Sequence, residues 1–242
     1  MTLWAETLAA LRGAERWLLP AECRLCGRPV SSLPDDPLIC PLCRSRWTPV
    51  PHPVCNRCGQ PRENDLECRI CSEWPKEFSG VQSAVWLSGS ARDAVHALKY
   101  EGWWRAAQGM APVMTRLEPL EPESVLVPIP LGAARRRERG YNQSAELAVA
   151  LGRLVLMPVR EDVLSRTRDT ARQTGLAPDA RRANLDRAFR AESCGTMRPV
   201  LVDDVFTTGA TLVAAAEALL LAGAPSVTAV TFARAVRPLD DI

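Results

Sequence analysis

The sequence predicts an α/β protein, a parallel sheet flanked by helices, preceded by a small module built on cysteines. Beyond residue 80, short apolar runs alternate with segments of helical length, which is the pattern of a parallel sheet covered on both faces. Before residue 75, eight of the nine cysteines form four C-x-x-C pairs. The length of 242 residues fits one domain of middling size and a smaller module.

Charge and hydropathy restrict the function classes. Thirty Lys and Arg against twenty-eight Asp and Glu leave a net charge of +2, so any basic surface must be a local patch. Residues 2–19 predict an amphipathic helix that ends at Pro20, and its charged residues exclude a signal peptide. No run approaches the roughly 18 uncharged apolar residues of a membrane span. We therefore expect a cytoplasmic protein without membrane insertion.

The cysteine pairs predict two structural zinc sites. Two residues between thiolates allow a tight turn to direct both sulfurs to one ion, and two such turns complete the tetrahedral shell of zinc. The spacing favours one site from Cys23, Cys26, Cys40 and Cys43 and another from Cys55, Cys58, Cys68 and Cys71. An interleaved arrangement, with the first pair beside the third, stays open. The module has few apolar residues, so metal binding must supply folding free energy, on the order of 10 kcal/mol per zinc.

The secondary structure of the larger domain follows from periodicity. Ser90 is a candidate N-cap, Pro112 is expected to kink or break a helix, and Gly223 is expected to end one. Apolar runs predict strands, and 3.6-residue periodicity predicts helices. We expect strands at 81–87, 124–129, 198–204 and 226–235, and helices at 91–100, 104–117, 142–155 and 210–223.

One stretch, "VLVDDVFTTGAT" at residues 200–211, indicates the binding site. The loop at 207–211 enters a helix, where unpaired backbone N–H groups and the helix dipole attract a phosphate. It lacks the lysine of a Walker loop, so a nucleoside triphosphate is not indicated. The adjacent carboxylates Asp203 and Asp204 suit a sugar with neighbouring hydroxyls. Ligands of parallel sheets bind beyond the carboxyl ends of the strands, where this stretch must lie.

Two basic segments accompany it. Arg135, Arg136, Arg137 and Arg139 directly follow the strand end "VPIPLG", and we expect them to bind an anion in the same crevice. Residues 165–187 carry six arginines without apolar periodicity. This segment is typical of a mobile lid, with a disordered loop as the alternative.

The stretch at 200–211 resembles the signature of type I phosphoribosyltransferases, which bind 5-phosphoribosyl 1-pyrophosphate (PRPP). The cysteine pairs together with "ALKYEG", "VPIPLGAARRRERGYNQS" and "LSRTRDTARQTGLAPDARRANLDRAF" resemble the ComF family over nearly the full length. This resemblance implies a double zinc ribbon at 21–75 and a phosphoribosyltransferase-like domain at 80–242, and the predicted N-terminal helix, at 1–20, precedes both. It also implies a link to DNA uptake during natural transformation.

The resemblance implies a role for each residue of the site. Asp203 and Asp204 would orient the ribose hydroxyls and favour positive charge at the anomeric carbon as pyrophosphate leaves. Mg²⁺ would bridge pyrophosphate and ribose oxygens. Lys99, Arg135 and Arg139 would offset the charge of the leaving group. The 5-phosphate would be held by Val205, Phe206, Thr207, Thr208, Gly209, Ala210 and Thr211.

Two other classes compete with an enzyme. The chain could bind single-stranded DNA through its cysteine turns, its arginine clusters and the aromatic rings of Trp74, Trp86, Trp103 and Trp104, although tryptophans of a core would give the same composition. It could also be an adaptor that docks on a competence helicase or translocase through the zinc ribbon and keeps the larger domain as a scaffold.

Overall fold

The sheet confirms the predicted fold class. The computed structural model describes residues 22–30, 38–61, 68–118, 120–121, 123–167 and 188–235, so the predicted N-terminal helix and the 168–187 part of the predicted lid lie outside them. Four strands form a parallel sheet in the order β1-β6-β5-β2. Their bounds are β1 Phe78–Trp86, β2 Ser124–Pro128, β5 Arg198–Phe206 and β6 Val227–Arg234.

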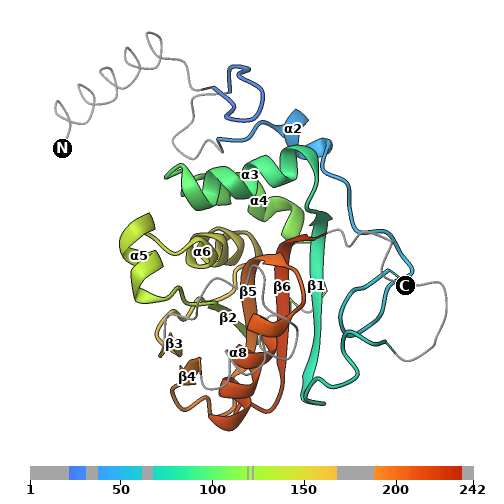
Figure 1. Cartoon of the computed structure of the whole chain (residues 1–242), viewed down its shortest axis with the longest axis vertical. Helices are drawn as coiled ribbons and strands as arrows, with labels where there is room; N and C mark the ends of the chain where they lie inside the picture. The colour runs from blue at the N-terminus through green and yellow to red at the C-terminus, as the bar shows by residue number, and fades with distance from the viewer. Residues whose placement is uncertain are drawn as a thin grey trace.

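Helices cover both faces of this sheet (Figure 1). One face packs against α3 (Gly89–Tyr100), α4 (Ala106–Met114) and α6 (Gln143–Val155). The other packs against α8 (Ala210–Leu221) and a small hairpin of β3 (Leu164–Arg166) and β4 (Phe189–Ala191). The short helix α5 (Ala133–Arg139) follows β2.

The central strand β5 shows why the sequence forms this sheet. Successive side chains of a strand point to opposite faces. Val200 and Val202 therefore pack in the core with α6, while Leu201 packs in the core with α8. All three are at most 1% exposed, so both faces of β5 are buried, as a continuous apolar run predicts.

Several predicted boundaries are corrected. Ser88, whose backbone is extended, precedes α3 as its N-cap residue, so the helix begins at Gly89 and the predicted cap at Ser90 is wrong. Pro112 lies inside α4, which runs on to Met114. Strand β1 begins three residues before the predicted start at 81, and β5 runs on to Phe206. The two carboxylates, Asp203 and Asp204, therefore lie within β5, and the loop begins only after Phe206.

The cysteine module contacts both faces of the sheet. It contains the short helix α2 (Pro41–Ser45). Ile39, beside the first cysteine group, packs so closely on α4 that a Cβ at Gly109 would lie 2.8 Å from the Ile39 Cβ. The second group instead adjoins β1, where the Val81 N–H donates to the carbonyl of Arg57 at 2.6 Å. Among the helices described, none is both long enough and apolar enough to cross a membrane.

Candidate functional site

The eight cysteines gather into the two predicted groups. Cys23, Cys26, Cys40 and Cys43 form one, and Cys55, Cys58, Cys68 and Cys71 form the other, with all sulfurs of a group within 4.8 Å of one another. The pairing is therefore sequential, and the interleaved alternative is excluded. Sγ···Sγ distances of 3.7 and 3.8 Å occur in the first group and of 3.6 and 3.4 Å in the second. A tetrahedron of thiolates about 2.3 Å from zinc has sulfurs about 3.8 Å apart, so both groups fit a structural zinc ion.

The second group illustrates why such a cluster needs a cation. Burial disfavours the thiolate of Cys55, but the backbone N–H groups of Cys58 and Arg57 donate to it and lower its pKa to about 6. Burial and the neighbouring thiols raise the pKa of Cys71 to about 12 and raise that of Cys58 as well. Four thiolates at this distance repel one another, and a divalent ion removes that penalty.

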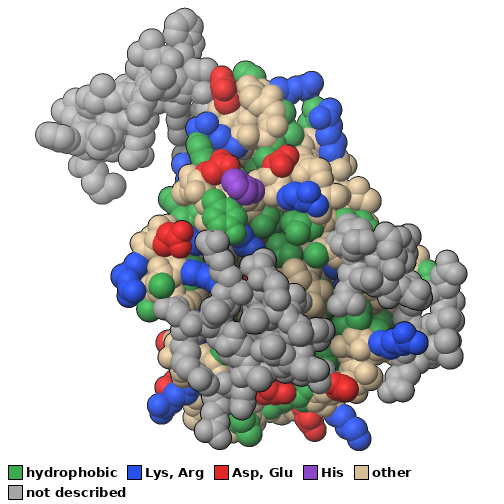
Figure 2. All heavy atoms as spheres, in the orientation of Figure 1, with side chains coloured by type: hydrophobic (Ala, Val, Ile, Leu, Met, Phe, Trp, Pro, Cys, Tyr) green, Lys and Arg blue, Asp and Glu red, His purple; other side chains and the backbone are tan. Residues whose placement is uncertain are grey.

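A cleft of about 1100 Å³ opens beyond the carboxyl ends of β2 and β5. Its walls come from α3, from the turn and helix 130–139, and from the loop that leads into α8. Figure 2 shows Lys and Arg side chains gathered over α5 at one side. The predicted residues that line the cleft are Lys99, Arg135, Arg139, Asp203, Asp204, Val205, Thr207, Thr208 and Thr211.

The two adjacent carboxylates have different partners. Lys99 Nζ lies 2.5 Å from Asp204 Oδ2, and the Asp204 side chain is only 4% exposed. Asp203 Oδ1 accepts hydrogen bonds from Ser144 Oγ at 2.7 Å and from the Asp204 N–H at 2.9 Å. In the structure Lys99 thus forms an ion pair with Asp204, whereas the resemblance implies that Lys99 offsets the charge of the leaving pyrophosphate.

These contacts set the protonation of the site. Burial, followed by the charge of Asp204, raises the pKa of Asp203 to about 7, although Lys99 and Ser144 oppose the shift. Burial would lower the pKa of Lys99, but the charge of Asp204, its hydrogen bond to Lys99 and the charge of Asp203 together outweigh burial and raise that pKa above its ordinary value. Near neutral pH Asp203 is therefore only partly ionised. A cation or hydroxyl donors beside Asp203 and Asp204 would favour the ionised form of Asp203.

The N-terminus of α6 supports the carboxylates. Asn142 caps this helix: its Oδ1 accepts from the Ser144 N–H at 3.2 Å, and its Nδ2 donates to the Ile129 carbonyl at 3.0 Å. Arg139 Nη1 donates to Gln143 Oε1 at 2.9 Å, and its guanidinium lies 5.0 Å from the centre of the Tyr100 ring. These links hold Ser144 beneath Asp203 and hold Arg139 at the edge of the cleft.

The phosphate-type loop has two sides. Thr207, Thr208 and Thr211 face the cleft, and the Ala210 N–H donates to Thr208 Oγ1 at 3.5 Å. Gly209 is the N-cap residue of α8, with a left-handed backbone at φ +82°. Phe206, Gly209 and Ala210 do not line the cleft; Phe206 is 1% exposed and packs below the loop. Of the predicted phosphate-binding residues, these three therefore lie on the core side of the loop and do not face the cleft.

Sequence reasoning missed the α3 wall of the cleft. Arg92, His96 and Tyr100 line it with Lys99. His96 Nδ1 is 2.9 Å from Glu101 Oε1, and Tyr100 is 64% exposed. Arg92, His96 and Lys99 stand at i, i+4 and i+7, so helical periodicity counted back from Lys99 could have found them.

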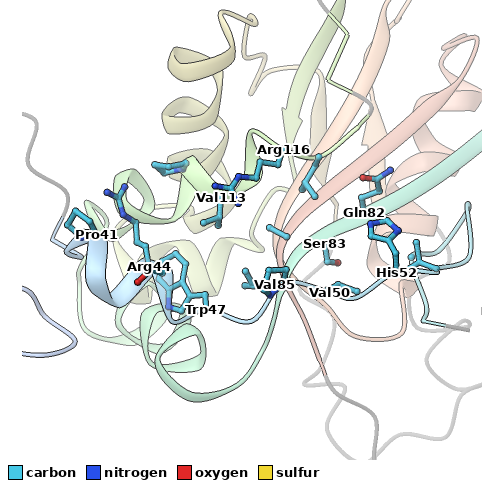
Figure 3. A pocket seen from close by; sticks show the side chains of 17 residues that line it. Pro41, Arg44, Trp47, Val50, His52, Gln82, Ser83, Val85, Val113 and Arg116 are labelled. Carbon is cyan, nitrogen blue, oxygen red and sulfur yellow. The ribbon is translucent and has the colours of Figure 1, made fainter.

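A second hollow of about 690 Å³ lies between the cysteine module, β1 and α4 (Figure 3). Arg44, Trp47, His52 and Arg116 are among its lining residues. No carboxylate occurs among the described residues that line it. The hollow lies against β1, which is an edge strand of the sheet. It therefore lacks the groups that a ribose phosphate with a metal ion requires.

Comparisons with known proteins cover both the cysteine module and the larger domain. The family model of a double zinc ribbon domain matches residues 14–72. The DNA utilization protein YhgH of Escherichia coli is 31% identical over 218 residues, which are 86% of this chain and 95% of that protein. The chain belongs to the ComF family. Two further relatives carry the competence name: ComFC of Bacillus subtilis is 28% identical over 84% of this chain and 86% of its own. Competence protein F of Haemophilus influenzae is 37% identical over 40% of this chain and 44% of its own.

Proposed function

We propose that this ComF-family chain binds PRPP with Mg²⁺ in the cleft and serves the handling of DNA during uptake. The observation that carries the proposal is the position of Asp203 and Asp204, near the end of β5 and two residues before a threonine-rich loop that leads into α8. The names of the relatives, which refer to DNA utilization and competence, support the wider role.

Each group in the cleft has a task in this proposal. The N–H groups at the start of α8 and the hydroxyls of Thr207, Thr208 and Thr211 bind the 5-phosphate. Asp203 and Asp204 accept from the ribose hydroxyls. Arg135 and Arg139 bind the pyrophosphate, because guanidinium groups match phosphate oxygens in charge and geometry.

The proposed magnesium ion arrives with the ligand. Mg²⁺ prefers oxygen ligands and is commonly held by one or two carboxylates together with phosphate oxygens. Asp203 and Asp204 offer such oxygens, and bound Mg²⁺ would neutralise charge that builds up on pyrophosphate. A transfer reaction would use the same contacts: Asp203 and Asp204 stabilise positive charge at the anomeric carbon, and Arg135 and Arg139 stabilise the departing pyrophosphate.

Titration with PRPP and Mg²⁺ tests the proposal. Binding should raise the melting temperature with ligand concentration, and calorimetry should give a dissociation constant. Thr208→Val with Thr211→Val should weaken binding by a few kcal/mol at most, since backbone donors remain. Thr115→Val, at an exposed threonine outside the cleft, is the control. Absence of any shift at millimolar PRPP would refute binding, and pyrophosphate release with and without nucleobases or DNA tests for transfer.

A second candidate function is the binding of single-stranded DNA on a surface separate from the phosphate loop at 207–211 but adjacent to it. Arg92, Arg135, Arg139 and Arg166 line the cleft, and the exposed ring of Tyr100 offers a stacking surface among them. Phosphate contacts of this kind give affinity that falls steeply with salt and is indifferent to base sequence. The adaptor role, with a helicase or translocase docked on the zinc ribbon, needs neither property.

The two ligands can be separated by one variant. Asp203→Asn with Asp204→Asn removes two negative charges but keeps the shape, so PRPP binding should weaken while DNA binding holds or rises slightly. Fluorescence anisotropy of a labelled oligonucleotide, with and without saturating PRPP and Mg²⁺, measures this. Loss of DNA binding in the variant, or complete displacement of DNA by PRPP, would contradict separate surfaces.

A further inference from the structure

The two cysteine groups belong to different halves of the core. The buried cysteines of the first group pack with α3, α4 and α6. The buried cysteines of the second group, Cys55, Cys58 and Cys71, pack with α8 and with Phe206, on the opposite face of the sheet. Phe206 is the last residue of β5 and directly precedes the loop of the cleft. The second group is therefore the one that shares a core with this loop.

Trp74 makes the first connection from the second group to the loop. Its backbone N–H donates to the Cys71 carbonyl at 3.2 Å, and its ring is stacked on Phe78 with centroids 5.1 Å apart. The Phe206 ring centroid lies 6.3 Å away. A Cβ added to Gly209 would lie 2.8 Å from Trp74 Cζ2. The indole is thus in contact with the backbone of the residue that caps α8.

Arg234, at the end of β6, makes the second connection. Although 2% exposed, it donates from Nη1 to the Cys58 carbonyl and from Nη2 to Gln60 Oε1, both at 2.7 Å. Its guanidinium carbon lies 4.3 Å from the centre of the Phe206 ring. The Phe206 ring therefore neighbours both Arg234 and Trp74. The Arg234 guanidinium is hydrogen-bonded to the Cys58 carbonyl, and the Trp74 backbone N–H to the Cys71 carbonyl.

Arg57 joins the two cysteine turns of the second group to Trp74. Its guanidinium donates to the carbonyls of Cys71, Trp74 and Pro75 at 3.1, 3.3 and 2.6 Å. A shift of either turn therefore moves the Trp74 segment. A zinc ion held by this group would cross-link the two turns and supply much of their folding free energy.

We propose that the second cysteine group, acting through Trp74 and Arg234, positions the loop at 207–209 and the first turn of α8 for phosphate binding. This rests on the proposed function, in which the loop binds the 5-phosphate. Neither Trp74 nor Arg234 lines the cleft, so both are positioning residues. A helix N-terminus binds an anion well only when its N–H groups converge on one point, and the packing under Gly209 and Phe206 fixes that convergence.

A matched pair of tryptophan variants tests the coupling. Trp74→Leu removes the ring beneath Gly209 and keeps an apolar side chain. Trp47→Leu is the control, because Trp47 is similarly buried at 5% but packs on Phe232 in the core of the first group. We expect Trp74→Leu to weaken PRPP–Mg²⁺ binding at least tenfold and Trp47→Leu to change it less than about twofold, with Trp74→Phe between the two. Equal losses in both variants, or none in Trp74→Leu, would overturn the proposal.

Hydrogen exchange without ligand supplies an independent readout. Amides 207–213 should exchange faster in Trp74→Leu than in wild type and should be unaffected in Trp47→Leu. Cys58→Ser should have the same effect as Trp74→Leu, and Cys26→Ser, in the first group, should not. If wild type fails to bind PRPP, the proposed function fails, and exchange alone decides the coupling. Unchanged exchange at 207–213 in Trp74→Leu and in Cys58→Ser would refute it, and if Trp74→Leu does not fold, Trp74→Phe and Cys58→Ser decide.

Discussion

Replacing Lys99 by Met should cost about 3 kcal/mol of unfolding free energy. The ion pair with Asp204 spans 2.5 Å, and the side chains of Lys99 and Asp204 are 21% and 4% exposed. At an effective dielectric constant of about 20, Coulomb attraction at this distance is about 7 kcal/mol, and the desolvation of both groups offsets much of it. Removal of one partner of a buried pair typically costs about 3–5 kcal/mol, and the partial exposure of Lys99 places this pair at the lower end.

Urea unfolding of the zinc-loaded protein, followed by circular dichroism, measures this cost. Lys76→Met, at an exposed lysine, is the control and should change stability by about 0.5 kcal/mol or less. The double variant Lys99→Met with Asp204→Asn should recover at least half of the loss, because the uncompensated charge is gone. A cost below about 1 kcal/mol for Lys99→Met, or strict additivity in the double variant, would refute the reasoning.

Three further predictions follow from the site. Because the pKa of Asp203 rises to about 7 in the folded protein, the native state holds more protons than the unfolded state above pH 4, so stability should fall as pH rises toward 7. Between pH 5.5 and 7 the free energy of unfolding should fall by about 2 kcal/mol more in wild type than in Asp203→Asn. Urea unfolding at each pH measures this difference, and parallel pH profiles of the two proteins would contradict the raised pKa of Asp203. Asn142→Ala should lose about 2 kcal/mol, since it removes the α6 cap and leaves the Ile129 carbonyl without its donor; a loss below about 0.5 kcal/mol would count against this. Metal analysis should find two zinc ions per chain, and fewer than one, or an iron chromophore, would contradict the assignment of the cysteine groups.

Local sequence determined the parts of the protein whose chemistry lies within a few residues. Each C-x-x-C pair directs two sulfurs to one point through a single turn, so the metal sites were predictable. The stretch at 200–211 contains strand, carboxylates, loop and helix start in succession, and the structure forms these elements in that order. Apolar periodicity predicted the four strands of the parallel sheet and the helices α3, α4, α6 and α8, with errors at ends such as Ser88, where the backbone geometry of single residues decides. It missed the short elements α2, α5, β3 and β4, which have too few residues to show a period.

Only the tertiary structure decided which distant residues meet. Asp204 pairs with Lys99 of α3, Asp203 accepts from Ser144 of α6, and Gly209 contacts Trp74 of the cysteine module. No local pattern encodes these contacts, because parallel strands joined by crossover helices bring segments far apart in sequence to the same edge of the sheet. The face on which each cysteine group packs was equally unpredictable, since it depends on strand order. The sequence therefore specified the binding groups themselves, whereas the parallel sheet decided which side chains hold them in place.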